Sequence, residues 1–396
     1  MQKLRVAVLN TQPPHLFYGG VERRIIEIAK RVSRCVDVII YSGMKAGFKK
    51  TTQINGITIV PCFSTDTFFP IDNWFFNETI ARTLTAIRVD VYEAHTVSGY
   101  KLLMTLRKRK IHKPFIQTIH GVLADEYVRY TTAGPITPRM RLSRVFLWYL
   151  ANLERMAARE STLIVTISNF SMKRISQLYH VKRDKIRIVP NGVDIHRFRP
   201  MKVSDDFRLK MNIAGESCIL FVGNLVPRKG LRLLIEAAVD VIKNNKDVKF
   251  IIVGDGPLKN SLIAYAHKLG VLKNFIFLGN VDDDTLIKLY NCSDVVTLPS
   301  FQEGQGITLL EAQATAKPVV ACKVGGISEA VLDGETGLLV NPNSREIAGA
   351  LITLLSDKTL RDKMGEKGRE HICRNFSWEI CAQKMLHVYE EALTLT

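Results

Sequence analysis

The chain has 396 residues, of which 46% are hydrophobic and 23% charged, a globular composition long enough for two hydrophobic cores. We expect neither a membrane span nor a signal peptide, because the longest apolar runs fall short of the ~20 residues that cross a bilayer and the N-terminus leads directly into a strand-like pattern. The seven cysteines are scattered without a CxxC pair, which disfavours a disulfide framework or a zinc site and favours a reducing compartment.

Positive charge is concentrated in the first half. Residues 1–200 contain 32 Lys and Arg against 14 Asp and Glu, a net charge of +18, whereas the remaining residues contain 23 against 24, a net charge of −1. Such asymmetry indicates an anionic partner, which could be phospholipid, lipid phosphate, an acidic polymer or nucleic acid. A solvated basic surface without a partner explains it equally well.

In chain order, short β-branched runs alternate with longer amphipathic stretches, which is typical of parallel βαβ units. We predict strands in the first half at 4–10, 36–42, 89–95, 114–120, 162–168 and 185–191. The second half repeats the pattern at 218–224, 249–255, 274–280, 294–300, 317–323 and 337–342. Most of these runs are continuously apolar, as strands covered by helices on both faces should be. The sequence therefore predicts an α/β protein with two doubly wound, Rossmann-like domains that face a central cleft.

A break in periodicity separates the two series of strands. Asn191 and Gly192 form a turn signal, and Pro200 follows with polar residues. We place the N-terminal domain at 1–194 and the C-terminal domain at 195–378, followed by an amphipathic helix at 379–396. Ligands of open α/β sheets bind outside the carboxyl ends of the strands, so the expected cleft is the candidate site.

The stretch PSFQEGQGITLLEA, residues 299–312, places two carboxylates around a glycine-rich turn and a helix start. Gly304 and Gly306 permit tight turns and close approach of a ligand. The N–H groups and the positive dipole end of the helix suit a diphosphate, while Glu303 and Glu311 can accept hydrogen bonds from sugar hydroxyls. Together these features predict a nucleotide-sugar site, although each glutamate taken alone is better explained as an ordinary helix charge, Glu303 at the helix N-terminus and Glu311 as a solvated helix residue.

A pair of cations lies in the loop of FVGNLVPRKGLRLLIEAA, residues 221–238. Arg228 and Lys229 follow a predicted strand, where they could clamp a leaving diphosphate as its charge grows. Two surface cations are the commoner role of such a dipeptide, and the shared position at the cleft favours the functional interpretation.

Two weaker signals lie in the first half. Gly19 and Gly20 precede a helix after the first strand, but the absence of GxGxxG and GxxxxGK[ST] gives no support to a dinucleotide fingerprint or a P-loop. His120 ends a strand beside Gly121, a good place for a hydrogen-bond donor to substrate. A plain tight turn and a satisfied core histidine are the respective alternatives.

The acidic run VDDDTL, residues 281–286, has the appearance of a DxD metal motif. It directly follows a strand and precedes a helix, so capping and dipole complementarity explain it. We expect no metal site here, and the His, Asp and Glu spacing elsewhere indicates none.

Taken together, these motifs resemble the family-4 group of retaining glycosyltransferases with the GT-B fold, essentially from end to end. The resemblance rests on Glu303-x7-Glu311 within PSFQEGQGITLLEA and on the following KPVVACKVGGISEAVLDGETGLLV. It is supported by NGVDIHRFRP, VGNLVPRKG, VGDGPL and the Gly-Gly loop near the N-terminus. These motifs in this order are specific, whereas most of them are weak singly.

The resemblance implies a role for each candidate residue. Glu303 would contact donor-sugar hydroxyls, Glu311 the ribose, and His120 the transferred sugar. The remaining donor contacts would be the amides of Gly306, Ile307 and Thr308 at the distal phosphate, Lys229 as cationic clamp, Asn280 and Val281 at the base, and Gly19 and Gly20 at the diphosphate. The helix after Trp378 would cross back onto the first domain.

Two positions depart from the family pattern. Many relatives carry arginine where this chain has Asn224, so we expect Arg228 to supply the missing charge at the donor diphosphate; the alternative is weaker binding of the diphosphate. The residue between the two glycines, often apolar or aromatic, is Gln305.

The implied reaction is transfer of a hexose or N-acetylhexosamine from a UDP- or GDP-sugar to a glycan or lipid-linked acceptor, in cell-envelope polysaccharide or glycolipid biosynthesis. The resemblance implies retention of anomeric configuration, with the leaving phosphate as the base and neither metal nor cofactor. Two alternatives are a sugar-nucleotide epimerase of the same shape and, less favoured, a basic nucleic-acid or membrane-binding protein. Nucleic acid is disfavoured because RRM, KH, zinc-finger and helix-turn-helix patterns are missing from the sequence.

Basic residues neighbour large apolar ones at 106–113 and 139–150, where Phe146, Trp148 and Tyr149 follow arginines. This composition suits an anionic membrane surface, and we expect a cytoplasmic enzyme that is peripheral on the inner face of the plasma membrane. The alternative keeps Phe146, Trp148 and Leu150 in the core.

Overall fold

The computed structural model describes residues 3–17, 19–85, 87–132 and 138–396, with the side chains of 129–143 outside the description. The chain divides into two compact units, Met1–Asn191 with Trp378–Thr396 (unit 1) and Gly192–Ser377 (unit 2). Each strand predicted from the sequence is present, with ends that differ by at most three residues. Within the described residues, none of the helices is both long and apolar enough to cross a membrane.

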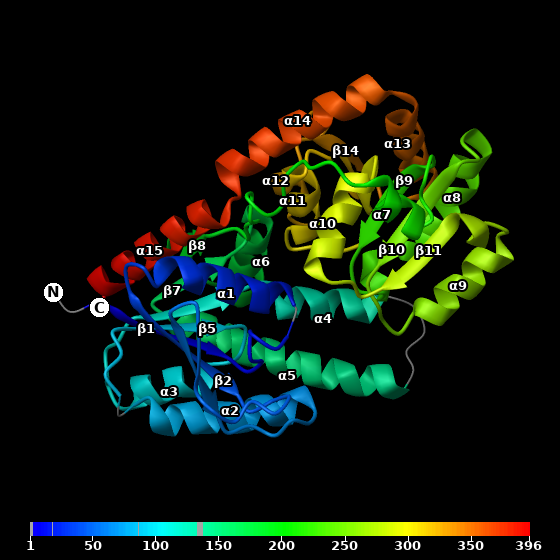
Figure 1. Cartoon of the computed structure of the whole chain (residues 1–396). Coiled ribbons are helices and arrows are strands. Elements are labelled where there is room, and N and C mark those ends of the chain that lie inside the picture. Colours follow the sequence, from blue (N-terminus) through cyan, green and yellow to red (C-terminus); the bar gives the residue numbers. More distant parts are fainter. Residues whose placement is uncertain (1–2, 18, 86, 133–137) are drawn as a thin grey trace. The chain divides into compact units, whose positions relative to one another are not determined.

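Unit 1 is a sheet in the order β3-β4-β2-β1-β5-β6-β7-β8, parallel except for the β3–β4 pair (Figure 1). Its strands are β1 (Arg5–Asn10), β2 (Asp37–Gly43), β3 (Thr52–Ile54), β4 (Ile57–Cys62), β5 (Val91–His95), β6 (Phe115–Ile119), β7 (Leu163–Thr166) and β8 (Ile186–Ile188). Its helices are α1 (Gly20–Val32), α2 (Phe69–Thr83), α3 (Tyr100–Lys108), α4 (Leu123–Thr132), α5 (Pro138–Glu160), α6 (Asn169–Tyr179) and α15 (Trp378–Thr394), with a 3-10 turn, η1 (Arg183–Lys185).

Alternation along β1 explains the layers of unit 1, since successive strand residues face opposite sides of a sheet. Val6 and Val8 join a core built with α1 and α15, whereas Ala7 and Leu9 join a second core built with α2 and α3. Figure 1 accordingly shows α1 and α15 on one face of this sheet and α2 and α3 on the other.

The last helix belongs to unit 1 because its apolar residues recur at helical spacing and lie against this sheet. Trp378, Met385 and Tyr389 are buried with residues of α1 and β1. Arg31 on α1 also donates to Glu379 at 2.8 Å. Trp378 therefore belongs with the first unit, not with the predicted 195–378 domain.

The other domain boundary also differs slightly from the sequence-based one. Val193 donates its N–H to the carbonyl of Phe376 at 2.8 Å, which places it in unit 2 although the predicted N-terminal domain extended to residue 194. The turn at Asn191 and Gly192 marks the change of unit.

The β3–β4 hairpin was not predicted from the sequence. Ile54 pairs with Ile57 across a two-residue turn, in which Asn55 and Gly56 have φ values of 50° and 79°. Positive φ at both positions is typical of a type I′ turn, and an Asn-Gly pair between strands is its usual signal.

Unit 2 is a parallel sheet in the order β11-β10-β9-β12-β13-β14. Its strands are β9 (Ser217–Val222), β10 (Val248–Val253), β11 (Phe275–Gly279), β12 (Val295–Leu298), β13 (Val319–Cys322) and β14 (Gly337–Val340). Its helices are α7 (Asp205–Lys210), α8 (Leu231–Asn244), α9 (Lys259–Lys268), α10 (Asp283–Cys292), α11 (Ile307–Ala314), α12 (Ile327–Ala330), α13 (Ser344–Ser356) and α14 (Lys358–Asn375), with the 3-10 turns η2 (Pro227–Lys229) and η3 (Leu272–Asn274).

Strand order locates the ligand-binding edge of unit 2. The chain builds β9, β10 and β11 in one direction and then returns to place β12 on the other side of β9. The loops after β9 and β12 therefore lie side by side where the direction reverses, which is where open α/β sheets bind ligands. These are the loops that carry Arg228, Lys229 and Glu303.

Candidate functional site

The loops after β9 and β12 are held together by their backbones. Phe301 donates its N–H to the carbonyl of Arg228 at 2.8 Å. Gly230 has φ = +67°, and a Cβ on it would lie 1.9 Å from the carbonyl oxygen of Pro299. A glycine is therefore needed at 230 both for its backbone conformation and for the contact between the loops.

Replacing Gly230 separates the cost of losing this contact between the loops from the cost of placing a side chain in the left-handed backbone conformation. We expect Gly230→Ala to destabilise unit 2 by more than Gly270→Ala, which has a similar φ of +72° but open space around its Cβ. The control should cost roughly 1–2 kcal/mol for the left-handed conformation. Thermal unfolding followed by circular dichroism measures both, and equal losses would contradict the proposed loop contact.

The side chain of Glu303 is contacted by residues of both loops. Lys229 Nζ lies 2.5 Å from Oε1 of Glu303, Ser300 Oγ donates to the same oxygen at 3.0 Å, and Arg228 Nη1 lies 3.5 Å away. The Glu303 side chain is 9% exposed and that of Lys229 is 12% exposed, so the pair is largely withdrawn from water.

The two carboxylate oxygens of Glu303 are not equivalent. Oε1 receives all three side-chain contacts, while Oε2 makes no hydrogen bond to the residues that the structure describes. A carboxylate oxygen can accept two hydrogen bonds, so Oε2 is available to a hydroxyl group of a ligand. Lys229 has three N–H donors, and its contact with Glu303 uses one of them.

A third loop fixes the backbone of Glu303. Gly326, after β13, donates its N–H to the Glu303 carbonyl at 3.1 Å, and a Cβ on the neighbouring Gly325 would lie 1.8 Å from the same oxygen. The role of Gly325 and Gly326 was not predicted from the sequence, although both lie in the stretch KPVVACKVGGISEAVLDGETGLLV. Ser300 was not predicted either, although it lies three residues before Glu303 in PSFQEGQGITLLEA.

The start of α11 lies in the same loop as Glu303. Gly306 is the N-cap residue, with φ = +84° and without a side-chain cap. Ile307 and Thr308 begin the helix, so helix geometry gives their N–H groups no intrahelical acceptor. The helix dipole adds positive potential at this end, and the two effects together favour an anion.

Glu311 lies one turn inside α11 and is buried, with 2% of its surface exposed. Tyr290 on α10 donates its hydroxyl to Oε2 of Glu311 at 2.7 Å. Tyr290 was not identified from the sequence, because its distance from Glu311 along the chain leaves no periodic signal.

The remaining donor-site candidates of unit 2 lie at the ends of other strands. Asn224 follows β9 and is exposed, whereas Asn280 and Val281 follow β11, with Asn280 exposed and Val281 partly buried. Asp282 caps α10, since its carboxylate accepts from the N–H of Thr285 at 2.8 Å. The predicted cap explanation of the acidic run is thus confirmed. Among the described residues, no group of three His, Cys, Asp or Glu could hold a metal ion.

The candidates of unit 1 lie at the carboxyl ends of its central strands. Gly19 and Gly20 are exposed at the start of α1, and a Cβ on Gly19 would lie 2.1 Å from Oε2 of Glu22. His120 follows β6 and is partly buried. Its Nε2 lies 2.8 Å from Nδ1 of His95, the last residue of β5.

Each unit is Rossmann-like, with a mainly parallel sheet, and unit 2 carries a carboxylate, two cations and an uncapped helix start at its switch point. These features are those expected of the class of two-domain sugar-transferring enzymes. The comparisons with known proteins agree. Residues 18–197 match the model of Glycosyltransferase Family 4, and residues 204–371 match that of Glycosyl transferases group 1. The D-inositol 3-phosphate glycosyltransferase of Corynebacterium glutamicum is 33% identical over 290 residues, which cover 71% of this chain and 67% of the relative. The chain belongs to the family-4 glycosyltransferases.

Solved structures of similar shape establish the fold as GT-B. Sucrose-phosphate synthase from Thermosynechococcus elongatus superposes with a TM-score of 0.83 at 19% identity, covering 100% of both chains. Anabaena HepE, solved with UDP and glucose, superposes with a TM-score of 0.76 at 22% identity, covering 98% of this chain and 99% of that one. The match spans only part of other curated relatives, namely 63% of the length of a Methanocaldococcus jannaschii relative and 55% of that of a Nocardia farcinica relative.

Proposed function

We propose that this protein transfers a hexose or N-acetylhexosamine from a UDP- or GDP-sugar to a glycan or lipid-linked acceptor, with retention of anomeric configuration. The observation that carries the proposal is the Lys229–Glu303 pair at the β9/β12 switch point, beside the uncapped start of α11. At this place, cations and backbone amides can bind a diphosphate, and the Oε2 atom of Glu303 can accept a hydrogen bond from a sugar hydroxyl. The HepE structure with UDP and glucose and the relatives named for glycosyl transfer support the same assignment.

In this proposal each group of unit 2 has a distinct task. Glu303 Oε2 accepts from a donor-sugar hydroxyl, and Glu311 meets the ribose. The amides of Gly306, Ile307 and Thr308 bind the distal phosphate, with Lys229 and Arg228 opposing its growing charge as the glycosidic bond breaks. Asn224, Asn280 and Val281 line the rest of the donor. Unit 1 contributes Gly19, Gly20 and His120, the last at the transferred sugar.

We propose an oxocarbenium-like transition state in which the acceptor hydroxyl attacks from the face of the departing phosphate. The leaving phosphate takes the acceptor proton, so the protein supplies position and electrostatic stabilisation without a metal or cofactor.

A donor screen tests the proposed reaction. The full chain is incubated with UDP-, GDP- and ADP-sugars, with and without EDTA, and released nucleotide and sugar are measured. We expect one nucleotide to stabilise the protein thermally, its sugar to be released slowly with retained configuration, and EDTA to leave the rate unchanged. Isomerised donor in place of released or transferred sugar would instead identify an epimerase.

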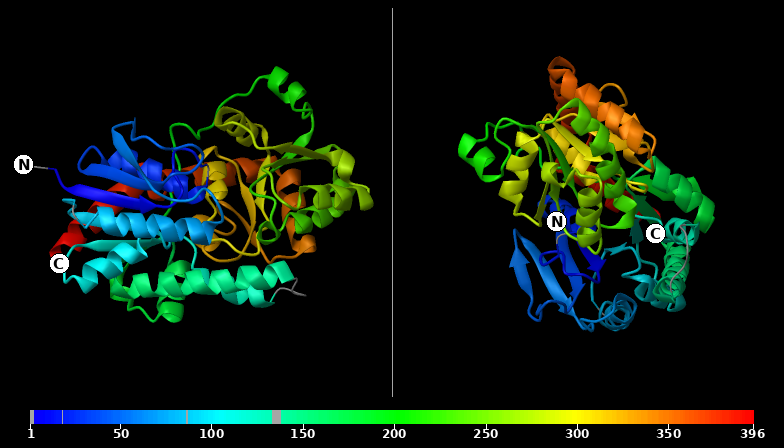
Figure 2. Two further views of the ribbon diagram at one scale, coloured as in Figure 1. Left: turned by 90° about the horizontal axis from the view of Figure 1, so that it is seen from below. Right: turned by 90° about the vertical axis from the view of Figure 1, so that its right-hand side faces the viewer.

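We further propose that unit 1 lies against an anionic membrane surface that carries the acceptor. An aromatic patch joins α2 to α5 in unit 1, formed by Phe63, Phe68, Ile71, Trp74, Val145, Trp148 and Tyr149, all of which are exposed. Figure 2 shows the ribbon of both helices, coloured by sequence. Phe68 meets Phe146 edge to face at 4.9 Å, which makes the patch continuous across the two helices. Trp148 is 54% exposed, so the sequence-based alternative that placed Phe146, Trp148 and Leu150 in the core is wrong for Trp148, whereas Leu150 is buried as that alternative expected.

Basic residues lie toward the other end of α5, where Arg107 in the last turn of α3 donates to the carbonyl of Glu160 at 2.8 Å. Lys108, Arg109 and Lys110 are exposed at the end of α3, which packs between α2 and α5. The side chains of the arginines at 139 and 141 lie outside the described residues. Aromatic and basic side chains are both typical of interfaces with anionic lipid, and their presence in unit 1 supports the proposal.

Removing two tryptophans tests the membrane surface. We expect the double variant Trp74→Ala, Trp148→Ala to sediment with phosphatidylglycerol-containing vesicles at least roughly tenfold more weakly than the parent, because each buried indole contributes about 1.5–3 kcal/mol. Leu209→Ala, at an exposed apolar residue of unit 2, serves as the control. If the parent pellets equally with neutral vesicles, charge complementarity has no part in the binding.

A further inference from the structure

Unit 1 has a hollow between α4, α5 and α6. Its volume is about 120 Å³, roughly ten times the 10–15 Å³ that one water molecule needs. The larger side chains that line it are Tyr127, Trp148, Asn152, Arg155, Leu178 and Tyr179. A hollow of this size can take part of an organic molecule.

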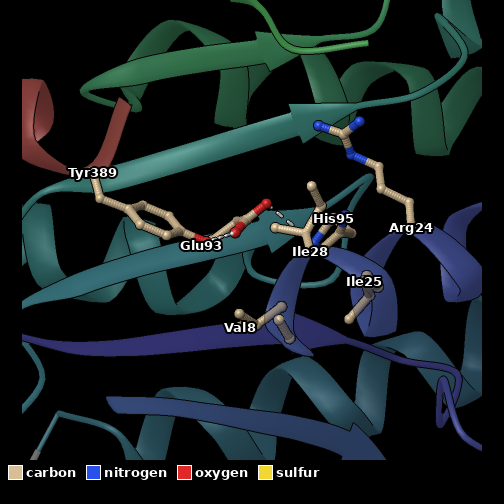
Figure 3. Close-up of a pocket in the computed structure, with 8 residues that line it drawn as sticks. Val8, Arg24, Ile25, Ile28, Glu93, His95 and Tyr389 are labelled. Atoms are coloured by element: carbon tan, nitrogen blue, oxygen red, sulfur yellow. Dashed lines mark hydrogen bonds and ion pairs between the residues drawn. The ribbon is translucent and has the colours of Figure 1, made fainter. Parts of the chain in front are cut away.

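The same unit contains a smaller pocket beside β5, which Figure 3 shows. There Tyr389 donates its hydroxyl to Oε2 of Glu93, and His95 Nε2 lies 3.3 Å from Oε1 of Glu93. The volume of this pocket is about 10 Å³, enough for roughly one water molecule. Of the two, the hollow between α4, α5 and α6 is therefore the candidate for a ligand.

Residue spacing on the helices explains the hollow. Trp148, Ala151 and Arg155 recur along α5 at intervals of three and four residues, which places them on one face of the helix. The helix α4 packs against α5 and contributes Ala124 to the lining. Because Ala124 and Ala151 each end in a methyl group, the space between the two helices is left unfilled.

Arginines bring positive charge to this hollow. Arg155 Nη2 donates to Oδ1 of Asn152 at 2.6 Å, and Asn152 Nδ2 donates to the Trp148 carbonyl at 2.9 Å. These bonds hold the guanidinium of Arg155 in place and use only one of its N–H donors. Arg144 adds a second guanidinium, whose central carbon lies 5.9 Å from the ring centre of Tyr127, within the range of a cation–π contact.

A buried carboxyl group behind the lining does not offset this charge at neutral pH. Tyr179 donates its hydroxyl to Oε2 of Glu154, which also accepts the N–H of Leu123 at 3.0 Å. Burial raises the pKa of Glu154 to about 8, so this group is mostly protonated and uncharged at pH 7. The charge of Arg155 is therefore left to a ligand.

The rest of the lining is largely apolar. Ala124, Ala151 and Leu178 face the hollow together with the ring of Trp148. Trp148 is also part of the exposed aromatic patch, so the hollow continues from the surface proposed to lie against the membrane. An anionic group joined to an apolar segment matches this combination better than a neutral sugar, which needs several hydrogen-bond partners.

We propose that this hollow binds the head group of an anionic phospholipid, with the phosphate at Arg155 and the adjoining apolar segment against Ala151 and Leu178. The inference rests on the proposed membrane surface and goes beyond it. A basic and aromatic surface responds to negative charge alone, whereas a built site binds one lipid and distinguishes its head group. A lipid held there also braces α4, which begins three residues after His120.

The test is a titration of the full-length protein with a phosphatidylglycerol whose short acyl chains keep it monomeric in solution. Phosphatidylcholine of the same chain length, glycerol 3-phosphate and inorganic phosphate are titrated in parallel. Tryptophan fluorescence reports binding, because the lipid removes water from the half-exposed Trp148. We expect saturable binding of one phosphatidylglycerol per chain and at least roughly tenfold weaker binding of the other three ligands.

The parallel ligands separate the parts of the proposal. Equal affinity for phosphatidylcholine would overturn recognition of an anionic head group. Equal affinity for glycerol 3-phosphate or inorganic phosphate would overturn a lipid as the occupant, since the apolar lining would then contribute nothing.

Two substitutions locate the site. Arg155→Gln can still donate to Asn152 but loses the charge, so it should weaken phosphatidylglycerol binding roughly tenfold or more. Ala151→Leu keeps the charge and fills the hollow, and it should weaken binding to a similar extent. Arg183→Gln is the matched control, because it removes the same charge from an exposed position of unit 1. Parental affinity in Arg155→Gln would overturn the proposal even if Ala151→Leu failed to fold.

The donor screen separates this inference from the proposed function. A protein that binds phosphatidylglycerol but neither releases nor transfers sugar would refute the proposed function and leave the lipid site standing. An active transferase that pellets with vesicles but does not bind the soluble lipid would overturn the lipid site and confine the membrane contact to the aromatic patch.

Discussion

Lys229→Ala is expected to reduce turnover about a hundredfold or more, the usual effect of removing one positioned group that stabilises developing charge. The ammonium is held 2.5 Å from Glu303 in a largely desolvated position, where it acts on a diphosphate through a lower effective dielectric than at the surface. The affinity for the free nucleoside diphosphate should fall together with turnover, because the same cation binds both forms.

Lys243→Ala provides the control for this variant. Lys243 also pairs with a carboxylate, that of Asp240 at 3.2 Å, but it is 72% exposed on α8. Surface pairs of this kind contribute little, so rate and affinity should both stay at the parental level. A Lys229→Ala enzyme with parental turnover would remove Lys229 from the site.

Glu303→Ala is expected to reduce turnover by a similar factor of about a hundred for a different reason, since it removes the acceptor for the sugar hydroxyl. It also frees Lys229 from its carboxylate partner, so we expect the affinity for the nucleoside diphosphate without sugar to be unchanged or higher. The two variants should thus have similar turnover rates but different affinities for the nucleoside diphosphate. Isothermal titration calorimetry measures these affinities.

Glu236→Ala is the matched carboxylate control. The Glu236 carboxylate accepts hydrogen bonds from Arg232 Nε at 3.3 Å and from the Tyr265 hydroxyl at 2.8 Å, on the solvent side of α8. Removing this carboxylate should therefore leave the kinetics unchanged. A fall in nucleotide affinity for Glu303→Ala equal to that for Lys229→Ala would show that Glu303 acts only by orienting the lysine.

Apolar patterning was enough to predict most strands, because buried parallel strands are continuously apolar and end at polar turns. Short edge elements were harder to predict. The Thr52–Ile54 strand has three residues, and its Asn55–Gly56 turn was the only strong cue. The predicted domain boundaries differ by a few residues from the observed ones, because a long-range hydrogen bond decides to which unit a residue belongs. Val193 is an example, since it bonds to Phe376 of unit 2.

For the site, the sequence supplied the charged residues but not their partners. Glu303, Lys229 and the α11 start were recognisable because they lie in compact motifs at strand ends. Their contacts with Ser300 and Gly325, and that of Glu311 with Tyr290, depend on which loops the sheet order brings together. Tyr389 lies 296 residues from Glu93 along the chain, so the buried network behind His120 could not be found from spacing at all.

A crystal structure of the full chain with its cognate nucleoside diphosphate, identified by the donor screen, tests the central claim most directly. The account predicts phosphate oxygens at the amides of Ile307 and Thr308 and at Lys229 Nζ, with Oε2 of Glu303 facing the position of the sugar. A nucleotide bound away from the β9/β12 loops, or one that leaves Lys229 and Glu303 without contact to it, would contradict the account.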